Sequence, residues 1–387
     1  IDMGNSSSLS LVSIRWCFLV FVWLITNFCV VLLVMKRCEG ELLLAPALYV
    51  FGDSTVDAGN NNKIQTFAKY DFLPYGIDFP AGPSGRPTSG RTIPDFFAES
   101  LGLKVPPPAI RLVETTSYNS IEGFNYASSS AGILPESGFK GSLSLGEQIS
   151  LFKKTVEEYL PLHLKDISCV NGVSGHLSKS IFLLVIGVND YALNFLKKNN
   201  TTTTMGAPPN DEAFAQLLIS NYGDHLKELY NLGARKFVVF DIEAMGCLPS
   251  YTNQKNELNS KCVDELNSMV QKFNGKLALK IQELGRTLPA SAFILGNNYQ
   301  HILNLVQNPQ SYGNTLLLWL EDGTNTCCGL TQYGTCDPSK VTCKDRNSHV
   351  FFDAAHTTEA AYKILAQECF SGVRVCQPMN LKTLAML

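Results

Sequence analysis

The chain has 387 residues, of which 45% are hydrophobic and 17% are charged, and its formal net charge is −3. This length allows one large or two ordinary domains with a sizeable buried core. The near-neutral charge and the lack of a Lys/Arg-rich run give no reason to expect a nucleic-acid partner. These totals do not separate an enzyme from a binding protein.

The N-terminal segment carries a long apolar run, Cys17–Met35, whose nineteen residues include no charge. Arg15 precedes this run, and a basic residue before an apolar stretch is typical of a signal peptide. We therefore predict a signal peptide over residues 1–40 and a single exported domain over 41–387. The run is also long enough to span a bilayer, so an uncleaved signal anchor over residues 17–35 is the alternative, and it would be the chain's only contact with a membrane.

Cysteine usage agrees with export. Twelve cysteines are present, and nine lie beyond residue 40, at positions 169, 247, 262, 327, 328, 336, 343, 369 and 376. In an exported chain this spacing indicates disulfides, although their connectivity stays open and an odd number leaves one thiol without an internal partner. Zinc at Cys327–Cys343 is the weaker reading, because no histidine is spaced as a partner. Asn199 and Asn200 begin two overlapping glycosylation sequons.

Short apolar runs alternate with amphipathic segments along the exported part. The predicted strands are Ala47–Phe51, Gly123–Ala127, Ser180–Gly187, Lys236–Asp241 and Ala290–Leu295. The predicted helices are Thr92–Leu101, Leu145–Leu160, Asp211–Leu232, Val263–Leu284 and Glu359–Phe370. This alternation predicts an α/β domain with a parallel sheet of five strands and helices on both faces.

The first strand leads directly into a candidate nucleophile. Gly52 allows a sharp turn after the strand, and Ser54 then lies at the carboxyl end of the sheet, where open α/β sheets bind ligands. A Gly-Asp-Ser turn is common, so Ser54 indicates catalysis only if a base and oxyanion donors accompany it.

Two further elements supply those partners. Of six histidines, only His356 has an aspartate three residues before it, so Asp353 can orient one imidazole nitrogen and leave the other as a base. Asn189 follows the buried third strand, where its amide can stabilise an oxyanion. Taken alone, an Asp-x-x-His sequence is more often a helix cap, and an asparagine after a strand is more often part of a turn. Together, their order along a parallel sheet predicts convergence at one rim.

These residues resemble those of plant-type GDSL esterases/lipases of the SGNH-hydrolase superfamily. The similarity covers residues 47–371. It rests on Phe51–Ser54, Gly187–Asp190 and Asp353–His356, and further on Phe237–Pro249, Ser311–Gly313, Thr326–Gly329 and Thr358–Ala361. The resemblance implies a flavodoxin-like, three-layer α/β/α fold and hydrolysis of acyl or acetyl esters, with a small-molecule or lipid ester as substrate and no metal or cofactor. It leaves the oligomeric state unknown.

Site residues follow from the same resemblance. Ser54 would be the nucleophile, His356 the base and then the acid, and Asp353 the residue that orients His356. The oxyanion hole would comprise the Ser54 N–H, the Asn189 side chain and the N–H of Ser129, which stands where the family has glycine. If that position requires a positive φ, serine is strained there and the donor is misaimed.

Two other functions remain possible at this stage. A chain disabled at Ser129 would be a non-catalytic or weakly active extracellular binding protein on the same fold. An active chain that passed its acyl group to another alcohol would be an acyltransferase. The expected location is extracellular, in the apoplast or cell wall, with a role in lipid metabolism.

Overall fold

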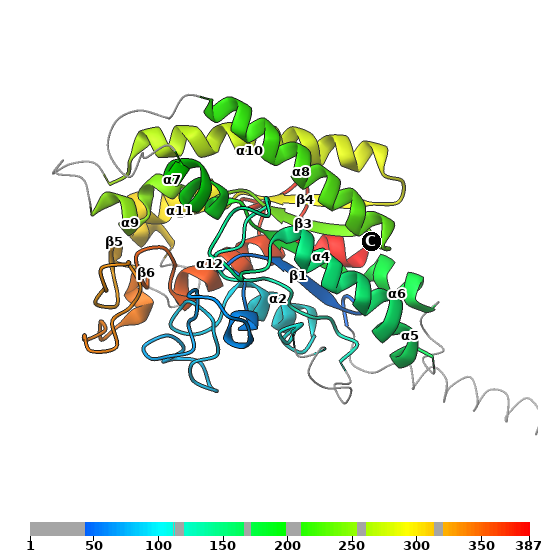
Figure 1. The fold of residues 1–387 in the computed structure, drawn as a ribbon, viewed down its shortest axis with the longest axis horizontal. Coiled ribbons are helices and arrows are strands. Elements are labelled where there is room, and N and C mark those ends of the chain that lie inside the picture. Colours follow the sequence, from blue (N-terminus) through cyan, green and yellow to red (C-terminus); the bar gives the residue numbers. More distant parts are fainter. Residues whose placement is uncertain are drawn as a thin grey trace, which may run out of the picture. The chain divides into compact units, whose positions relative to one another are not determined.

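Five strands form the central sheet of the computed structural model, which describes residues 43–110, 112, 120–165, 172–198, 210–253, 261–312 and 320–387 (Figure 1). In spatial order they are β1 (Leu48–Gly52), β2 (Ile181–Val185), β3 (Lys236–Phe240), β4 (Ala292–Gly296) and β7 (Cys376–Gln377). The first four pair in parallel, and β7 runs antiparallel to β4 at the edge. The α/β fold class is thus as expected, with four parallel strands and one antiparallel strand.

The predicted strand at Gly123–Ala127 is the main difference. This segment hydrogen-bonds along the free side of β1, for example from Tyr126 N to Val50 O at 2.7 Å, but it forms only isolated bridges. Gly123 has a φ of 111°, which interrupts the extended backbone. With this segment included, the order along the chain becomes 2-1-3-4-5, the order of flavodoxin-like sheets.

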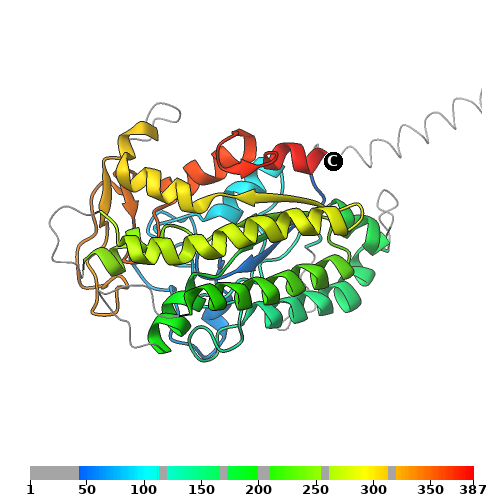
Figure 2. The same ribbon diagram turned by 90° about the horizontal axis from the view of Figure 1, so that it is seen from above.

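Helices cover both faces of the sheet, giving three layers. Tyr49 and Phe51 of β1 point into a core shared with α4 (Leu145–Lys154), α8 (Asp211–Asn231), α10 (Asp264–Thr287) and α11 (Asn298–Gln307). Leu48 and Val50 point the other way, toward α2 (Ile93–Leu101), α12 (Glu359–Ser371) and α13 (Leu381–Met386). Figure 2 shows α8 and α10 running side by side across the first face. The alternation of buried side chains on β1 therefore fixes the two layers.

Helix boundaries follow local signals with two exceptions. Thr358 caps α12 by accepting a hydrogen bond from Ala361 N, as its sequence position predicts. The helix that begins at Leu145 passes Pro161, because a π-helical turn precedes that proline. Gly285 lies inside α10 rather than at its end. Packing against α8 and β4 thus outweighs the low helix propensity of glycine.

The remaining elements are short and lie mainly in the connections. They are the helices α5 (Leu160–His163), α6 (Gly172–Lys179), α7 (Leu196–Lys198) and α9 (Pro249–Thr252), the strands β5 (Asp322–Thr326) and β6 (His349–Phe351), the π-helical turns η2 (Thr155–Tyr159) and η3 (Asp190–Phe195), and the 3-10 turns η1 (Asn60–Lys63), η4 (Met245–Cys247), η5 (Pro309–Tyr312) and η6 (Arg346–Ser348). β5 and β6 pair with each other beside the main sheet.

Four disulfides join eight of the nine cysteines beyond residue 40. The pairs are Cys247–Cys262, Cys327–Cys343, Cys328–Cys336 and Cys369–Cys376, and Cys169 lies outside the described residues. Within the described residues no helix is long and apolar enough to span a membrane. The apolar run at residues 17–35 lies outside them.

Candidate active site

The end of β1 holds Ser54 in a fixed position at the carboxyl edge of the sheet. A Cβ at Gly52 would collide with the carbonyl oxygen of Val185 on β2, so only glycine allows the two strands to approach this closely. The side-chain amide of Gln148 brackets the same residue, accepting from Gly52 N and donating to Gly52 O at 2.8 Å each. Ser54 follows two residues later and is 8% exposed. The local backbone thus presents its hydroxyl from a rigid support.

His356 and Asp353 lie against this hydroxyl, as their spacing predicts. The Nε2 atom of His356 is 2.8 Å from Ser54 Oγ, and Nδ1 is 2.9 Å from both carboxylate oxygens of Asp353. Asp353 Oδ1 also accepts the backbone N–H groups of Ala355 and His356, each at 2.8 Å. In this arrangement a histidine can take a proton from the serine hydroxyl while the carboxylate holds the imidazole in place.

Two tyrosines that the sequence did not reveal complete the surroundings of the Asp–His pair. The Tyr75 hydroxyl donates to Asp353 Oδ2 at 2.6 Å and accepts from Cys336 N at 2.9 Å. The Tyr70 ring meets the His356 imidazole edge-on, with centroids 5.3 Å apart. Both tyrosines belong to the loop that follows η1, and the sequence of this loop has no hydrophobic periodicity. No sequence signal pointed to them.

Acidic side chains raise the pKa of the His356 imidazole. Burial lowers the pKa of His356, but the charge and hydrogen bond of Asp353, together with the charges of other nearby carboxyl groups, raise it more, so its pKa lies above the usual value. Asp53 and Glu243 raise the pKa of His356 further through their charges. Burial and, next, the charge of Glu243 raise the pKa of Asp53 to about 7, although hydrogen bonds from Thr55 act in the opposite direction. The protonated imidazole is thus stabilised by three carboxyl groups.

Comparison with known proteins decides the family. A family model described as GDSL-like Lipase/Acylhydrolase matches residues 48–369. The chain belongs to this family. It is 38% identical over 350 residues to GDSL esterase/lipase At1g71691 of Arabidopsis thaliana, covering 89% of this chain and 86% of that relative. It is 39% identical over 351 residues to GDSL esterase/lipase 7 of the same plant, covering 89% and 93%. This GDSL protein is therefore a carboxylic ester hydrolase.

Ser129 of this GDSL hydrolase does not point its N–H at the substrate side. Its N–H donates to Asp57 Oδ2 at 3.0 Å, and its hydroxyl donates to the same oxygen at 2.8 Å. The other oxygen of the buried Asp57 accepts the N–H groups of Gly59 and Asn60. The Ser129 N–H, predicted to be an oxyanion donor, is therefore already used inside the protein in this conformation.

The left-handed residue of the same loop is Ser130, with a φ of 67°, and Ser129 is not among the described residues with positive φ. Within the part of the chain that the structure describes, the backbone N–H groups of Ser130 and Ser54 have no hydrogen-bond acceptor. Ser128 N donates to Gly52 O at 3.0 Å, which joins this loop to the end of β1. The backbone strain of a positive φ, expected at Ser129, is therefore found at Ser130.

Asn189 directs one amide hydrogen of Nδ2 to Ala131 O at 3.0 Å, which places its side chain beside the same loop. The second amide hydrogen remains as a donor. Its neighbour Asp190 anchors that loop by accepting the N–H groups of Ile133 and Leu134. The Ser54, Ser130 and Asn189 donors therefore come from three connections that meet at the carboxyl edge of the sheet.

Other predicted sites have different outcomes. Asn199 and Asn200 lie outside the described residues. A ligand atom of His349 lies within 4.8 Å of the sulfurs of Cys327 and Cys343, so a histidine does approach this cysteine pair. The two sulfurs are bonded to each other, however, and a disulfide offers no thiolate to a metal.

Proposed function

We propose that the chain hydrolyses its ester through an acyl-enzyme on Ser54. The observation that carries this proposal is the continuous hydrogen-bonded chain from Ser54 Oγ through His356 to Asp353. Membership of an esterase family supports the reaction class, and the geometry supports the assignment of residues.

The proposed reaction has two halves. His356 Nε2 takes the proton of Ser54 as Oγ attacks the ester carbonyl carbon, and the resulting tetrahedral oxyanion collapses with cleavage of the bond to the alcohol oxygen. The imidazolium gives its proton to that oxygen, and the alcohol leaves. Water then attacks the acyl-enzyme by the same route, which releases the acid and restores Ser54.

We assign the oxyanion hole to the Ser54 N–H, the second amide hydrogen of Asn189 and the Ser130 N–H. Ser130 replaces the predicted Ser129 because the latter's N–H is bound to Asp57. Removing one such donor typically slows a reaction by about 10²–10³. Substituting Asn189 by Ala should therefore lower kcat by that factor, with a smaller change in KM.

Hydrolysis of p-nitrophenyl butyrate and p-nitrophenyl palmitate by the purified protein tests the assignment. Ser54→Ala should abolish turnover and labelling by a fluorophosphonate probe. Turnover that survives this substitution would refute the role of Ser54. A folded protein with neither turnover nor labelling would instead be the binding protein considered above. Transfer to an added alcohol in preference to water would identify an acyltransferase.

For location, we propose secretion and a role in lipid metabolism. An apolar run flanked by basic residues at 17–35, four disulfides and two sequons support passage through an oxidising compartment. Expression in plant cells should yield extracellular protein whose mobility shifts after glycosidase treatment. Retention in the membrane fraction would favour the signal anchor instead. Loss of the shift in Asn199→Gln/Asn200→Gln would assign the glycan.

A further inference from the structure

One of the four disulfides differs from the other three in its exposure. Seven of the eight cysteines that form them are buried, with exposed fractions of 7% or less, whereas Cys343 is half-buried. Its partner Cys327 is 2% exposed. Attack on a disulfide requires that the attacking thiolate reach one of the two sulfurs. Among the disulfides that the structure describes, Cys343 is therefore the cysteine that a thiol in solution reaches most readily.

A histidine lies beside this disulfide. A ring nitrogen of His349, the first residue of β6, lies within 4.8 Å of the sulfurs of both Cys327 and Cys343. The ring is held through Nδ1, which is 3.2 Å from Asp345 O and 3.0 Å from Ser348 Oγ. An imidazolium next to a thiolate stabilises its charge and can protonate it, which makes that sulfur a better leaving group.

Cys327 is also hydrogen-bonded to the strand that leads into the turn of the Asp–His pair. Its N–H donates to Phe351 O at 3.0 Å, and the N–H of Cys328 donates to Phe352 O at 2.9 Å. Phe352 directly precedes Asp353 in the chain. The disulfide therefore fixes the segment that holds this end of β6 in place, and opening the disulfide removes one constraint on the turn.

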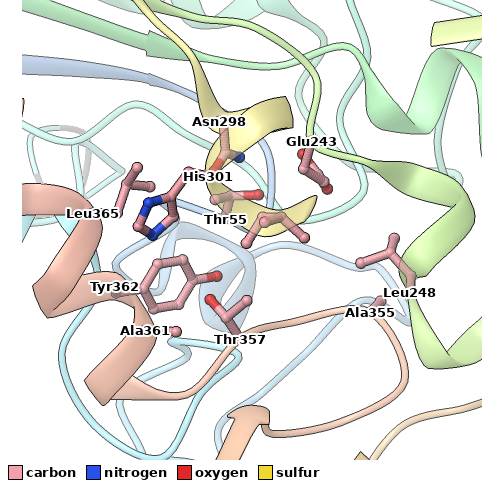
Figure 3. A pocket seen from close by; sticks show the side chains of 11 residues that line it. Thr55, Glu243, Leu248, Asn298, His301, Ala355, Thr357, Ala361, Tyr362 and Leu365 are labelled. Carbon is pink, nitrogen blue, oxygen red and sulfur yellow. The ribbon is translucent and has the colours of Figure 1, made fainter. Parts of the chain in front are cut away.

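The far side of the same turn borders a cavity. The cavity measures about 20 Å³, which is room for a single water, and its walls include Ala355, Thr357 and Glu243. Figure 3 shows Glu243 across this space from Thr357. Side chains that border a cavity lack packing contacts on that side. The position of the turn, and with it that of His356, therefore depends strongly on β6.

We propose that Cys343 is a site of reversible modification by a small thiol, which opens the Cys327–Cys343 disulfide and thereby lowers the ester hydrolase activity. The incoming thiolate attacks Cys343 Sγ and forms a new S–S bond there, while the bond to Cys327 Sγ breaks. The electron pair stays on Cys327 Sγ, which takes a proton from the His349 imidazolium, and the proton lost by the small thiol restores that imidazolium. A second thiol then attacks the mixed disulfide, which releases the small molecule as its own disulfide and leaves two protein thiols.

The order in which the disulfides open tests the site. The folded, full-length protein is incubated with reduced glutathione, free thiols are alkylated, and peptide mass spectrometry gives the opened fraction of each disulfide. Cys343 should carry a glutathione adduct, and Cys327–Cys343 should open roughly tenfold faster than each of the other three. Equal rates for all four disulfides, earlier opening of another one, or no opening of Cys327–Cys343 would each overturn the proposal.

Activity measured in the same samples tests the coupling to the turn. Hydrolysis of p-nitrophenyl butyrate should fall in proportion to the opened fraction of Cys327–Cys343 and should return when oxidised glutathione closes the disulfide again. Full activity in the opened protein would refute the coupling. The loss of activity rests on the role proposed for His356, whereas the order of opening does not. A protein that hydrolyses no ester before treatment would therefore sink the proposed function and leave the test of Cys343 intact.

Two histidine variants isolate the contribution of His349. His349→Gln removes the proton donor beside the disulfide, so Cys327–Cys343 should open several-fold more slowly while the other three disulfides keep their rates. His163→Gln is the matched control, because His163 is also half-buried and also contacts a backbone carbonyl through Nδ1, that of Tyr159 at 2.9 Å. It should leave all four rates as in the wild type. An unchanged rate of opening in His349→Gln would refute the step assigned to His349.

Discussion

Tyr75 donates a hydrogen bond of 2.6 Å to Asp353, across 278 residues of sequence, and both side chains are buried. Tyr75→Phe removes a donor from a buried carboxylate and also leaves Cys336 N without its acceptor. We expect the free energy of unfolding to fall by about 2 kcal/mol. We also expect kcat to fall about tenfold, since Asp353 then holds His356 less firmly. Chemical denaturation and steady-state kinetics measure the two effects.

Tyr70→Phe is the matched control for that substitution. No hydrogen bond of the Tyr70 hydroxyl is found among the described residues, whereas its ring contacts His356. Phenylalanine keeps the ring, so stability and kcat should change little. A loss in Tyr70→Phe as large as that in Tyr75→Phe would show that the hydrogen bond to Asp353 is not the cause.

The pH dependence of kcat/KM should report the raised pKa of His356. In the proposed mechanism the neutral imidazole is the base, so activity should fall as the pH drops through its pKa. Because Asp353, Asp53 and Glu243 raise that pKa, the acid limb should lie above the ordinary histidine value of about 6.5. Asp353→Asn should move the limb to lower pH and reduce kcat by up to about 10⁴. A limb at or below 6.5 in the wild type would contradict the proposed electrostatics.

Ser129 and Ser130 should respond oppositely to glycine. Ser130 has a φ of 67°, so Ser130→Gly should be more stable than Ser130→Ala by roughly 1–2 kcal/mol. Ser129 lacks a positive φ, so Ser129→Gly should be less stable than Ser129→Ala by about 0.5–1 kcal/mol. Thermal unfolding of the four variants checks both signs. A gain in activity in Ser129→Gly would revive Ser129 as a strained oxyanion donor.

The disulfide Cys328–Cys336 should affect both stability and activity. It closes a loop with a sequence separation of 8, and its loss should cost roughly 2.5 kcal/mol through chain entropy. Cys336 also carries the N–H that positions Tyr75, so activity should fall in Cys328→Ala/Cys336→Ala. The disulfide Cys369–Cys376 has a similar separation of 7 and joins α12 to β7. Its removal should cost similar stability and spare kcat.

Much of the fold could be predicted because the sheet is buried on both faces. The runs at Ala47–Phe51 and Lys236–Asp241 are almost uninterrupted apolar stretches, and they became β1 and β3 with shifts of about one residue. β7 was missed because two residues carry no periodicity. The segment at Gly123–Ala127 has the composition of a strand, yet its glycine breaks the extended backbone.

The candidate site divides in the same way. The contact between His356 and Asp353 could be predicted because both residues belong to one short turn, so their spacing in the sequence is enough to indicate it. Tyr75 reaches Asp353 from a distant loop, and nothing in its local sequence marks that contact. The sequence predicted the Ser129 N–H as an oxyanion donor, but this N–H donates instead to Asp57, which is 72 residues away. Hydrogen bonds between residues so far apart in the chain cannot be predicted from local sequence patterns.

The hydroxyl of Ser54 and the imidazole of His356 meet across 302 residues of chain. During synthesis the proposed nucleophile emerges with the first strand, whereas the proposed base emerges 302 residues later. β1 also depends on β2 and on the segment after Gly123 for its hydrogen bonds, so its turn is not held in place while the nascent chain is short. Under the proposed mechanism, hydrolytic activity would therefore require that both ends of this span of 302 residues have been made and folded together.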